Sequence, residues 1–189
     1  YEISASLVGS EMCIRDRYTQ KDILNLACRK DIKLFFFGFR YLKLYLHQVM
    51  NIDFVYNTDF KLNNENEIRS WIGVFCKSHK FNIDTLVFAF FTKEELKNLN
   101  IKYLSHDYYT DVISFDDSDN TVLSGNIAIS PEVVSENAEN YSVTFKNELN
   151  RVMIHGVLHF MGYSDSSEEE IKTMRVKENE ALKMFHVKQ

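Results

Sequence analysis

The chain has 189 residues, 45% of them hydrophobic and 26% charged, and its formal net charge at pH 7 is −5. The hydrophobic share is ordinary for a globular protein, and the sequence holds no internal repeat or low-complexity segment. An acidic chain has poor general affinity for phosphate backbones, which argues against a nucleic-acid-binding protein that relies on charge alone.

The sequence divides into three parts. Residues 1–17 read as a translated linker or assembly scar and are expected to be non-native, and residues 18–49 are either an extra helical arm or translated upstream DNA. Residues 50–189 begin with a methionine and are expected to form one domain, since 140 residues can bury an adequate interior. This last part carries 14 basic and 22 acidic side chains, a formal net charge of −8.

Cysteine content and hydropathy indicate the compartment. Cys76 is the only cysteine after residue 49, so the domain has no internal disulfide and a reducing compartment is expected. The apolar stretch at residues 34–39 is too short to cross a bilayer, and residues 1–17 do not read as a signal peptide. We therefore expect a cytoplasmic protein that does not associate with membranes.

Apolar patterns predict four strands in the domain. The second is a nearly continuous apolar run, which is typical of a strand in the middle of a sheet. In chain order the predicted strands are residues 52–56, 85–91, 112–115 and 123–130.

Helices are predicted between and after these strands, the first over residues 63–80 and a later one ending at Met161. Their predicted N-caps are, in order, Thr92, Ser130, Thr144 and either Ser166 or Ser167. The apolar stripes of the first and last helices are expected to face the core: Ile68, Trp71, Ile72 and Phe75, then Ile171, Met174, Ala181, Leu182 and Phe185. The expected fold class is α+β, a small mixed β-sheet of about four strands covered by helices.

His155 and His159 lie four residues apart on the helix that ends at Met161, so both imidazoles project from one face and can reach the same ion. Gly162 can take the positive φ that ends a helix and turns the chain back, which would bring Asp165 round as a third ligand. Two nitrogens and one carboxylate oxygen leave a fourth position open, as in catalytic zinc sites. The spacing therefore predicts a site for one zinc ion on this helix and the loop that follows it.

A histidine pair at helical spacing is by itself a weak signal, and the combination with Gly162 and Asp165 makes it specific. The same spacing is found in metzincin zinc peptidases, whose pattern is HExxHxxGxxH. Gly156 stands where those enzymes carry the glutamate that serves as general base, so peptide hydrolysis is the second choice.

Residues 155–165, HGVLHFMGYSD, resemble the signature HGxLHxxGYDH of the YbeY family, metal-dependent endoribonucleases of bacterial ribosomal RNA maturation. Two upstream segments are similar to further family motifs in the same order: residues 99–115 to LNxxYRxxDxPTDVLSF, and residues 124–130 to GDIxIS. The sequence departs from the family at Ser164, usually Asp, and at Asp165, usually the third His. An aspartate ligand adds negative charge, which favours harder ions and makes bound water less acidic.

A third departure is Leu104, which stands where the family carries an Arg thought to contact the RNA. A leucine cannot pair with a phosphate, and Lys102 and His106 are the nearest candidates to replace the cation. His106 is also a candidate catalytic base beside the three ligands if its ring points into the cleft. Thr110 and Asp111, at the entry of a strand, are candidates for substrate binding, and the alternative for Asp111 is that it only ends a loop.

Two further sets of charges have alternative interpretations. Glu148, seven residues before His155 on the same helix face, either orients a ligand, lines the cleft or is solvated. Lys93, Lys97 and Lys102 follow one predicted helix and form either a basic strip for RNA or a solvated face, with their charge balanced by the neighbouring glutamates 94 and 95.

The resemblance implies a single-strand-specific, zinc-dependent endoribonuclease that acts in 3′-end maturation of 16S ribosomal RNA and in ribosome quality control. Its implied partners are ribosomal RNA and the small ribosomal subunit, with ribosomal proteins or an assembly GTPase as further candidates. The alternatives are a metzincin-like zinc peptidase and a non-catalytic ribosome-assembly factor whose metal is structural.

Overall fold

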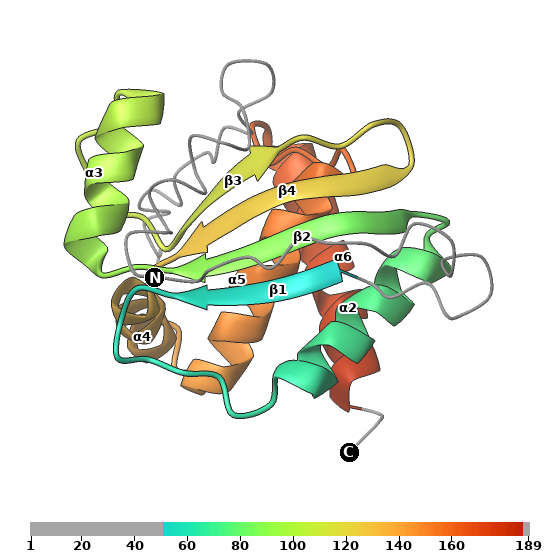
Figure 1. Cartoon of the computed structure of the whole chain (residues 1–189), viewed down its shortest axis with the longest axis horizontal. Helices are drawn as coiled ribbons and strands as arrows, with labels where there is room; N and C mark the ends of the chain where they lie inside the picture. The colour runs from blue at the N-terminus through green and yellow to red at the C-terminus, as the bar shows by residue number, and fades with distance from the viewer. Residues whose placement is uncertain (1–50, 187–189) are drawn as a thin grey trace, which may run out of the picture.

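The computed structural model describes residues 51–186 (Figure 1). The expectations for residues 1–17 and 18–49, and for a start at residue 50, lie outside the described residues. In chain order the elements are β1 (Asn51–Tyr56), α2 (Glu65–Ser78), β2 (Asn82–Phe90), α3 (Lys93–Leu104), β3 (Val112–Asp116), β4 (Val122–Ile129), α4 (Pro131–Asn140), α5 (Phe145–Phe160) and α6 (Glu168–His186).

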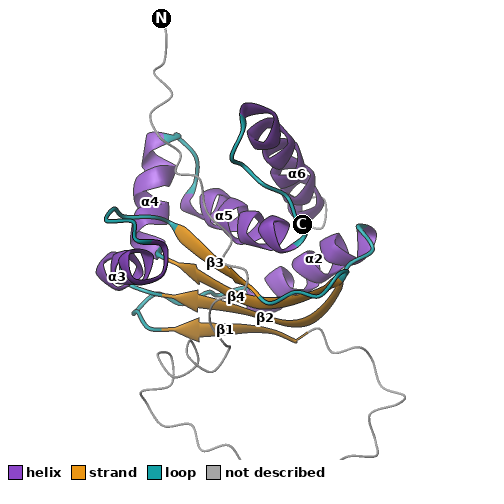
Figure 2. Cartoon of the chain, turned by 90° about the horizontal axis from the view of Figure 1, so that it is seen from above, coloured by secondary structure: helices purple, strands orange, loops and turns teal. Residues whose placement is uncertain are grey.

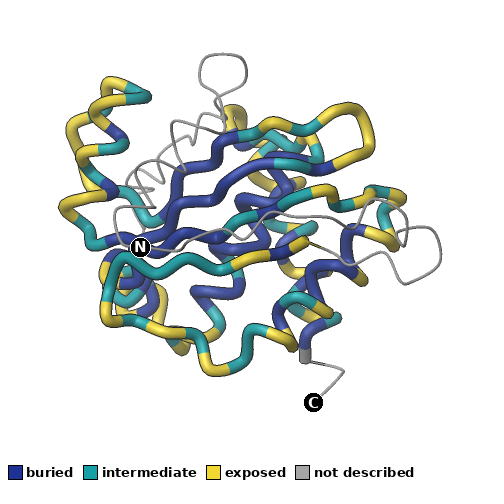
Figure 3. The backbone as a smooth tube through the Cα atoms, viewed as in Figure 1, coloured by how far each residue is buried: buried dark blue, intermediate teal, exposed yellow. Residues whose placement is uncertain are grey.

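The strands form one four-stranded sheet in the order β1-β2-β4-β3. β1, β2 and β4 run parallel, and β3 pairs antiparallel with β4. β2 and β4, the inner strands, end in runs of buried residues, whereas β1 at the edge is mostly half-buried or exposed (Figure 3). The predicted α+β fold, with a small mixed sheet and a central second strand, is confirmed.

Each face of the sheet carries its own apolar cluster, because side chains alternate along a strand. One row across the sheet belongs to the main core and is continued on β3 by a serine: Phe54, Phe88, Ile127 and Ser114. The next row points to the opposite face and packs with α3: Val55, Ala89, Ala128 and Ile113. Helices α2, α5 and α6 gather over the main-core face (Figure 2).

The apolar stripe of α2 is buried as predicted, and it fixes α2 against α6. The Trp71 Nε1–H donates to the carbonyl oxygen of Ala181 at 2.7 Å, and the Trp71 and Phe185 rings lie 5.0 Å apart in an edge-to-face contact. A hydrogen bond of this kind satisfies the polar end of a buried indole. The C-terminal helix is therefore anchored to the core by a specific contact as well as by apolar packing.

The predicted helix starts are confirmed, with Ser167 rather than Ser166 as the last cap. The side chains of Thr92, Ser130 and Thr144 accept from backbone N–H groups of the first turn, and Ser167 Oγ accepts from the N–H of Glu170 at 3.3 Å.

One core prediction is wrong. Ile171 lies in the first turn of α6, ahead of the buried Met174, and is 41% exposed. Among residues 51–186, no helix combines the length and apolar character that crossing a bilayer requires.

Candidate metal centre

The two histidines are positioned by α5, which is almost entirely buried from Leu149 onwards. Gly162 takes a φ of 88° just after the helix, as predicted. Its N–H donates to the carbonyl oxygen of His159 at 2.9 Å, and the N–H of Tyr163 donates to that of Leu158 at 3.1 Å. This pair of bonds is a Schellman ending, which reverses the chain and sends the next residues back over the helix face.

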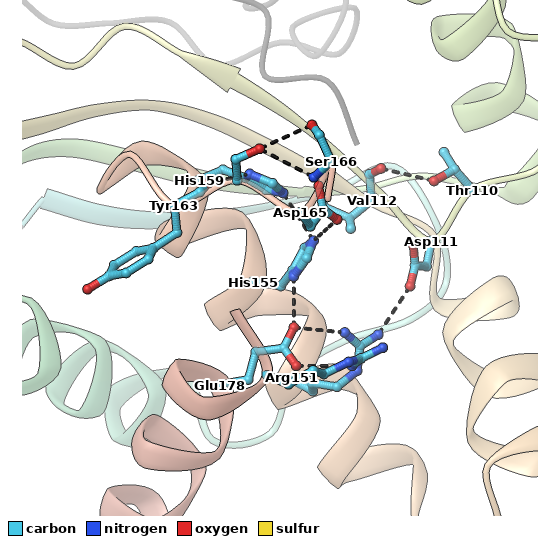
Figure 4. A network of polar contacts seen from close by, with 12 residues as sticks. Thr110, Asp111, Val112, Arg151, His155, His159, Tyr163, Asp165, Ser166 and Glu178 are labelled. Atoms are coloured by element: carbon cyan, nitrogen blue, oxygen red, sulfur yellow. Dashed lines mark hydrogen bonds and ion pairs between the residues drawn. The ribbon is translucent and has the colours of Figure 1, made fainter. Parts of the chain in front are cut away.

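The reversed loop brings Asp165 to the two imidazoles, as the sequence predicts (Figure 4). His155 Nε2 lies 3.1 Å from His159 Nε2 and 3.8 Å from Asp165 Oδ2. One ligand atom from each of the three residues lies within 4.8 Å of the others, and all three side chains are buried. A divalent cation fits this donor set of two imidazoles and one carboxylate.

The hydrogen bonds on the far side of each ring fix the tautomers. His155 Nδ1 lies 2.7 Å from Glu178 Oε1, and His159 Nδ1 lies 3.0 Å from the carbonyl oxygen of Tyr163. Both partners only accept, so each Nδ1 carries the proton and each Nε2 of a neutral ring presents a lone pair. Two lone pairs that face each other at 3.1 Å beside a carboxylate require a cation or an extra proton between them.

Behind His155 lies a buried charge network around Arg151. Its guanidinium contacts Glu148 at 2.7 Å, Glu178 at 3.2 Å and Asp111 at 3.5 Å. Burial alone would lower the pKa of Arg151, but the hydrogen bond that it donates to Glu148 and the three carboxylate charges raise it above its usual value. Arg151 therefore stays charged, and it joins α5 to α6 and to the segment before β3.

Glu178 of α6 has only 2% of its surface exposed. Burial would raise the pKa of Glu178, but the hydrogen bond from His155 and the charge of Arg151 hold it below its ordinary value. It is therefore an ionised acceptor rather than a donor, which is the basis for placing the proton on His155 Nδ1.

Sequence reasoning missed Arg151 and Glu178, although both left a signal. Glu178 lies on the apolar stripe of α6 between Met174 and Ala181, where a charged side chain breaks the pattern. Arg151 lies three residues after Glu148 and four before His155, on the same helix face. Glu148 itself is buried rather than solvated, and Arg151 binds its carboxylate.

Asp111 and Thr110 lie just before β3. The Asp111 carboxylate accepts from Arg151, one turn before His155, and from Asn137 Nδ2 at 3.2 Å. Thr110 Oγ1 donates to the carbonyl oxygen of Val112 at 3.1 Å (Figure 4). These contacts connect Asp111 to the helix of the two candidate histidine ligands, and the assignment of both residues to substrate binding stays a prediction.

Lys102 and His106 contact neighbouring tyrosines. Lys102 Nζ donates to Tyr103 Oη at 3.0 Å, and His106 Nδ1 lies 3.0 Å from Tyr108 Oη with the two rings stacked 5.2 Å apart. Their roles as a substrate cation and a catalytic base stay predictions. Leu104 packs against the apolar cluster on the α3 side of the sheet.

Lys93 and Lys97 of α3 are accompanied by carboxylates. Lys93 Nζ lies 3.2 Å from Glu136 Oε1, and Lys97 Nζ lies 2.9 Å from Asp107 Oδ1. The sequence suggested Glu94 and Glu95 as the balancing charges, whereas the structure shows Glu136 and Asp107. These carboxylates offset the positive charge of the two lysines in the same way. Exposed pairs of this kind contribute little stability and reduce the attraction for phosphate.

Comparison with known proteins gives a consistent result. The family model described as "Endoribonuclease YbeY" matches residues 52–186. A relative of that name from Christiangramia forsetii is 45% identical over 138 residues, which cover 73% of this chain and 96% of the relative. Another, from Flavobacterium johnsoniae, is 41% identical over 138 residues, 73% of this chain and 99% of its own length. The solution structure of TM1509 from Thermotoga maritima has the same fold, with a TM-score of 0.53 at 24% identity over 71% of this chain and 87% of that one.

Proposed function

Because the chain belongs to the YbeY family of endoribonucleases, we propose that it is a zinc-dependent enzyme that cleaves single-stranded ribosomal RNA. The observation that carries the metal assignment is the pair of Nε2 lone pairs that face each other at 3.1 Å beside the Asp165 carboxylate. His155, His159 and Asp165 would hold the ion. A bound dication supplies Lewis-acid chemistry: it stabilises charge that develops on a phosphodiester and makes water more acidic.

The chain's own residues organise this chemistry. Glu178 and the Tyr163 carbonyl hold a proton on each Nδ1, which fixes the orientation of each ring. The ring of Tyr163 points away from the imidazoles and packs against the core, so its phenol takes no part in proton transfer (Figure 4).

The biological role that fits this activity is 3′-end maturation of 16S ribosomal RNA and ribosome quality control in the cytoplasm. The small ribosomal subunit is then the partner, together with ribosomal proteins or an assembly GTPase. A partner that presents the RNA is favoured on physical grounds, because residues 50–189 carry a net charge of −8 and Lys93 and Lys97 lie beside carboxylates.

The metal assignment is tested by elemental analysis and RNA cleavage on purified full-length chain. The wild-type protein should hold about one zinc ion per chain and cut unstructured ribosomal RNA in a chelator-sensitive way. Asp165→Ala should lose both properties, whereas Asp165→His, which restores the family residue, should keep the metal. Ser164→Ala is the matched control and should keep the metal, since the neighbouring Asp165 supplies the ligand. Equal zinc content in Asp165→Ala and in the wild type would refute the assignment of Asp165 as the third ligand.

A second candidate is a ribosome-assembly factor that binds RNA without cutting it and uses the metal structurally. The observation that favours it is Leu104, which packs in an apolar cluster where the family has a phosphate-binding cation. RNA that is bound but stays intact, with and without chelator, would support this candidate. A peptidase is not supported, because Gly156 has no proton acceptor and faces Ile127 and Ser114 closely.

A further inference from the structure

We propose that Glu178 is a positioning residue for the metal centre: it orients His155 from α6, and Arg151 holds Glu178 in place. The inference rests on the metal site proposed above. It extends the functional set beyond residues 155–165 to a helix that supplies no ligand of its own.

The first argument is the contact itself. The 2.7 Å distance between His155 Nδ1 and Glu178 Oε1 is that of a short, charge-assisted hydrogen bond. It sets both the tautomer and the rotation of the ring, and so directs Nε2 toward His159 and Asp165. A carboxylate partner also makes the opposite nitrogen a stronger donor to a metal. His159 has a neutral carbonyl in the equivalent place, so the two ligands are supported unequally.

The second argument is the cost of placing a carboxylate there. Glu178 takes a position that Met174 and Ala181 mark as apolar, and burying an ionised group there is unfavourable unless opposite charges compensate it. The unfavourable free energy of burying the charge of Glu178 is offset by two cations: Oε1 contacts Arg151 at 3.2 Å, and Oε2 contacts Arg175 at 3.0 Å. Of the polar contacts that Glu178 makes, the one with His155 is the shortest, at 2.7 Å, so this carboxylate is directed at the ring of a proposed ligand.

The third argument is charge. The Arg151 guanidinium is shared among Asp111, Glu148 and Glu178. Three carboxylates against the guanidinium groups of Arg151 and Arg175 leave one excess negative charge behind His155, and Asp165 adds a further carboxylate on the ligand side. A dication held by His155 would balance this negative charge, whereas an uncharged group at the same place would not.

The test compares variants at two glutamates of α6 in the full-length chain. Glu178→Gln keeps an acceptor oxygen but loses the charge, and Glu178→Ala removes both. Glu180→Gln is the matched control, because Glu180 has a side chain 44% exposed and pairs with Lys177 at 2.8 Å. The dissociation constant for Zn²⁺ is measured by competition with a chromophoric chelator, and thermal unfolding of the zinc-free proteins is followed in parallel.

The expected weakening of zinc binding is about tenfold for Glu178→Gln and up to about 100-fold for Glu178→Ala, with no change for Glu180→Gln. Long-range ¹H–¹⁵N NMR should show the proton of His155 on Nδ1 in the wild type and a mixture of tautomers in Glu178→Ala. If Glu178 had a purely structural role, its replacement would lower the unfolding temperature but change neither the dissociation constant for Zn²⁺ nor the tautomer of His155.

Variants that fold and bind zinc within about threefold of the wild type would refute the positioning role while the metal centre stands. If Glu178→Ala does not fold, the isosteric Glu178→Gln decides the question. A wild-type chain that binds no zinc would overturn the metal centre and the positioning role together, whatever its effect on RNA.

Discussion

Replacing Arg151 should lower the free energy of unfolding, because its guanidinium contacts two buried carboxylates. Its side chain is 16% exposed, and the carboxylates of Glu148 and Glu178 that it contacts are 4% and 2% exposed. Methionine has a similar length and no charge, so Arg151→Met leaves two buried carboxylates without this cation. Breaking a buried ion pair from one side costs about 3–5 kcal/mol, out of the roughly 5–15 kcal/mol that stabilise a typical domain.

The assay is urea denaturation of the full-length chain at pH 7, followed by circular dichroism. Arg175→Met is the control, because Arg175 is 39% exposed and makes one contact with Glu178 at 3.0 Å. Its expected effect on the free energy of unfolding is under about 1 kcal/mol. Equal stability of the two variants would refute the reasoning, since it would mean that the network around Arg151 contributes no more than a surface pair.

The pH dependence gives a second check on the same variant. The folded-state pKa of Glu178 is held below 4.5, so its contribution to stability is present above that pH and is lost as the pH falls through the folded pKa. The deficit of Arg151→Met relative to wild type should therefore narrow as the pH is lowered below 4.5 and the carboxylates take up protons. A deficit that stays constant from neutral pH into this range would show that lost packing, not charge, is responsible.

Two further predictions concern the core. In Gly156→Ala the new Cβ would lie 2.8 Å from Ile127 Cγ2 and 3.1 Å from Ser114 Oγ. Overpacking should cost about 1–3 kcal/mol, more than the gain of about 1 kcal/mol in helix propensity. The variant should therefore unfold at a lower urea concentration and bind zinc more weakly than the wild type. Unchanged stability would show that α5 can shift to make room for the new methyl group. Burial raises the pKa of the Cys76 thiol to about 12. Peptide mapping should find Cys76 unmodified by iodoacetamide at pH 8 in the native protein and modified in urea, and modification of the native form would contradict its burial. Because its folded pKa exceeds the unfolded one, the contribution of this thiol to stability is complete below pH 9.0 and lost as the pH rises toward 12.

Local patterns in the sequence were sufficient for the elements and for the convergence of the three candidate ligands. The helix caps at Thr92, Ser130 and Thr144, the buried second strand and the turn at Gly162 each depend on a few neighbouring residues. The ligand set was equally local, because His155 and His159 share a helix face and Asp165 follows after a single reversal. The resemblance to the YbeY family, which rested on these residues and on two upstream motifs, is confirmed.

Contacts between distant segments could not be predicted in the same way. Glu178 lies 23 residues from His155, and Asp111 lies 40 residues from Arg151. The apolar stripe of α6 marks Glu178 as an unusual carboxylate, but nothing in the sequence says which cation or imidazole it meets. Ile171 shows the same limit: helical periodicity placed it on the core stripe, but where α6 meets the core decided that it is exposed.

By itself the sequence determined the order of the elements, the family and the three candidate ligands, since each depends on residue type and on spacing within a helix or turn. Tertiary structure alone decided what supports those ligands: the packing of α6 against α5 that brings Glu178 to His155, and the approach of the β3 entry to Arg151 that buries several charges together. The physical reason is that buried charges find their partners in space, after the apolar faces of the helices and the sheet have fixed which segments meet.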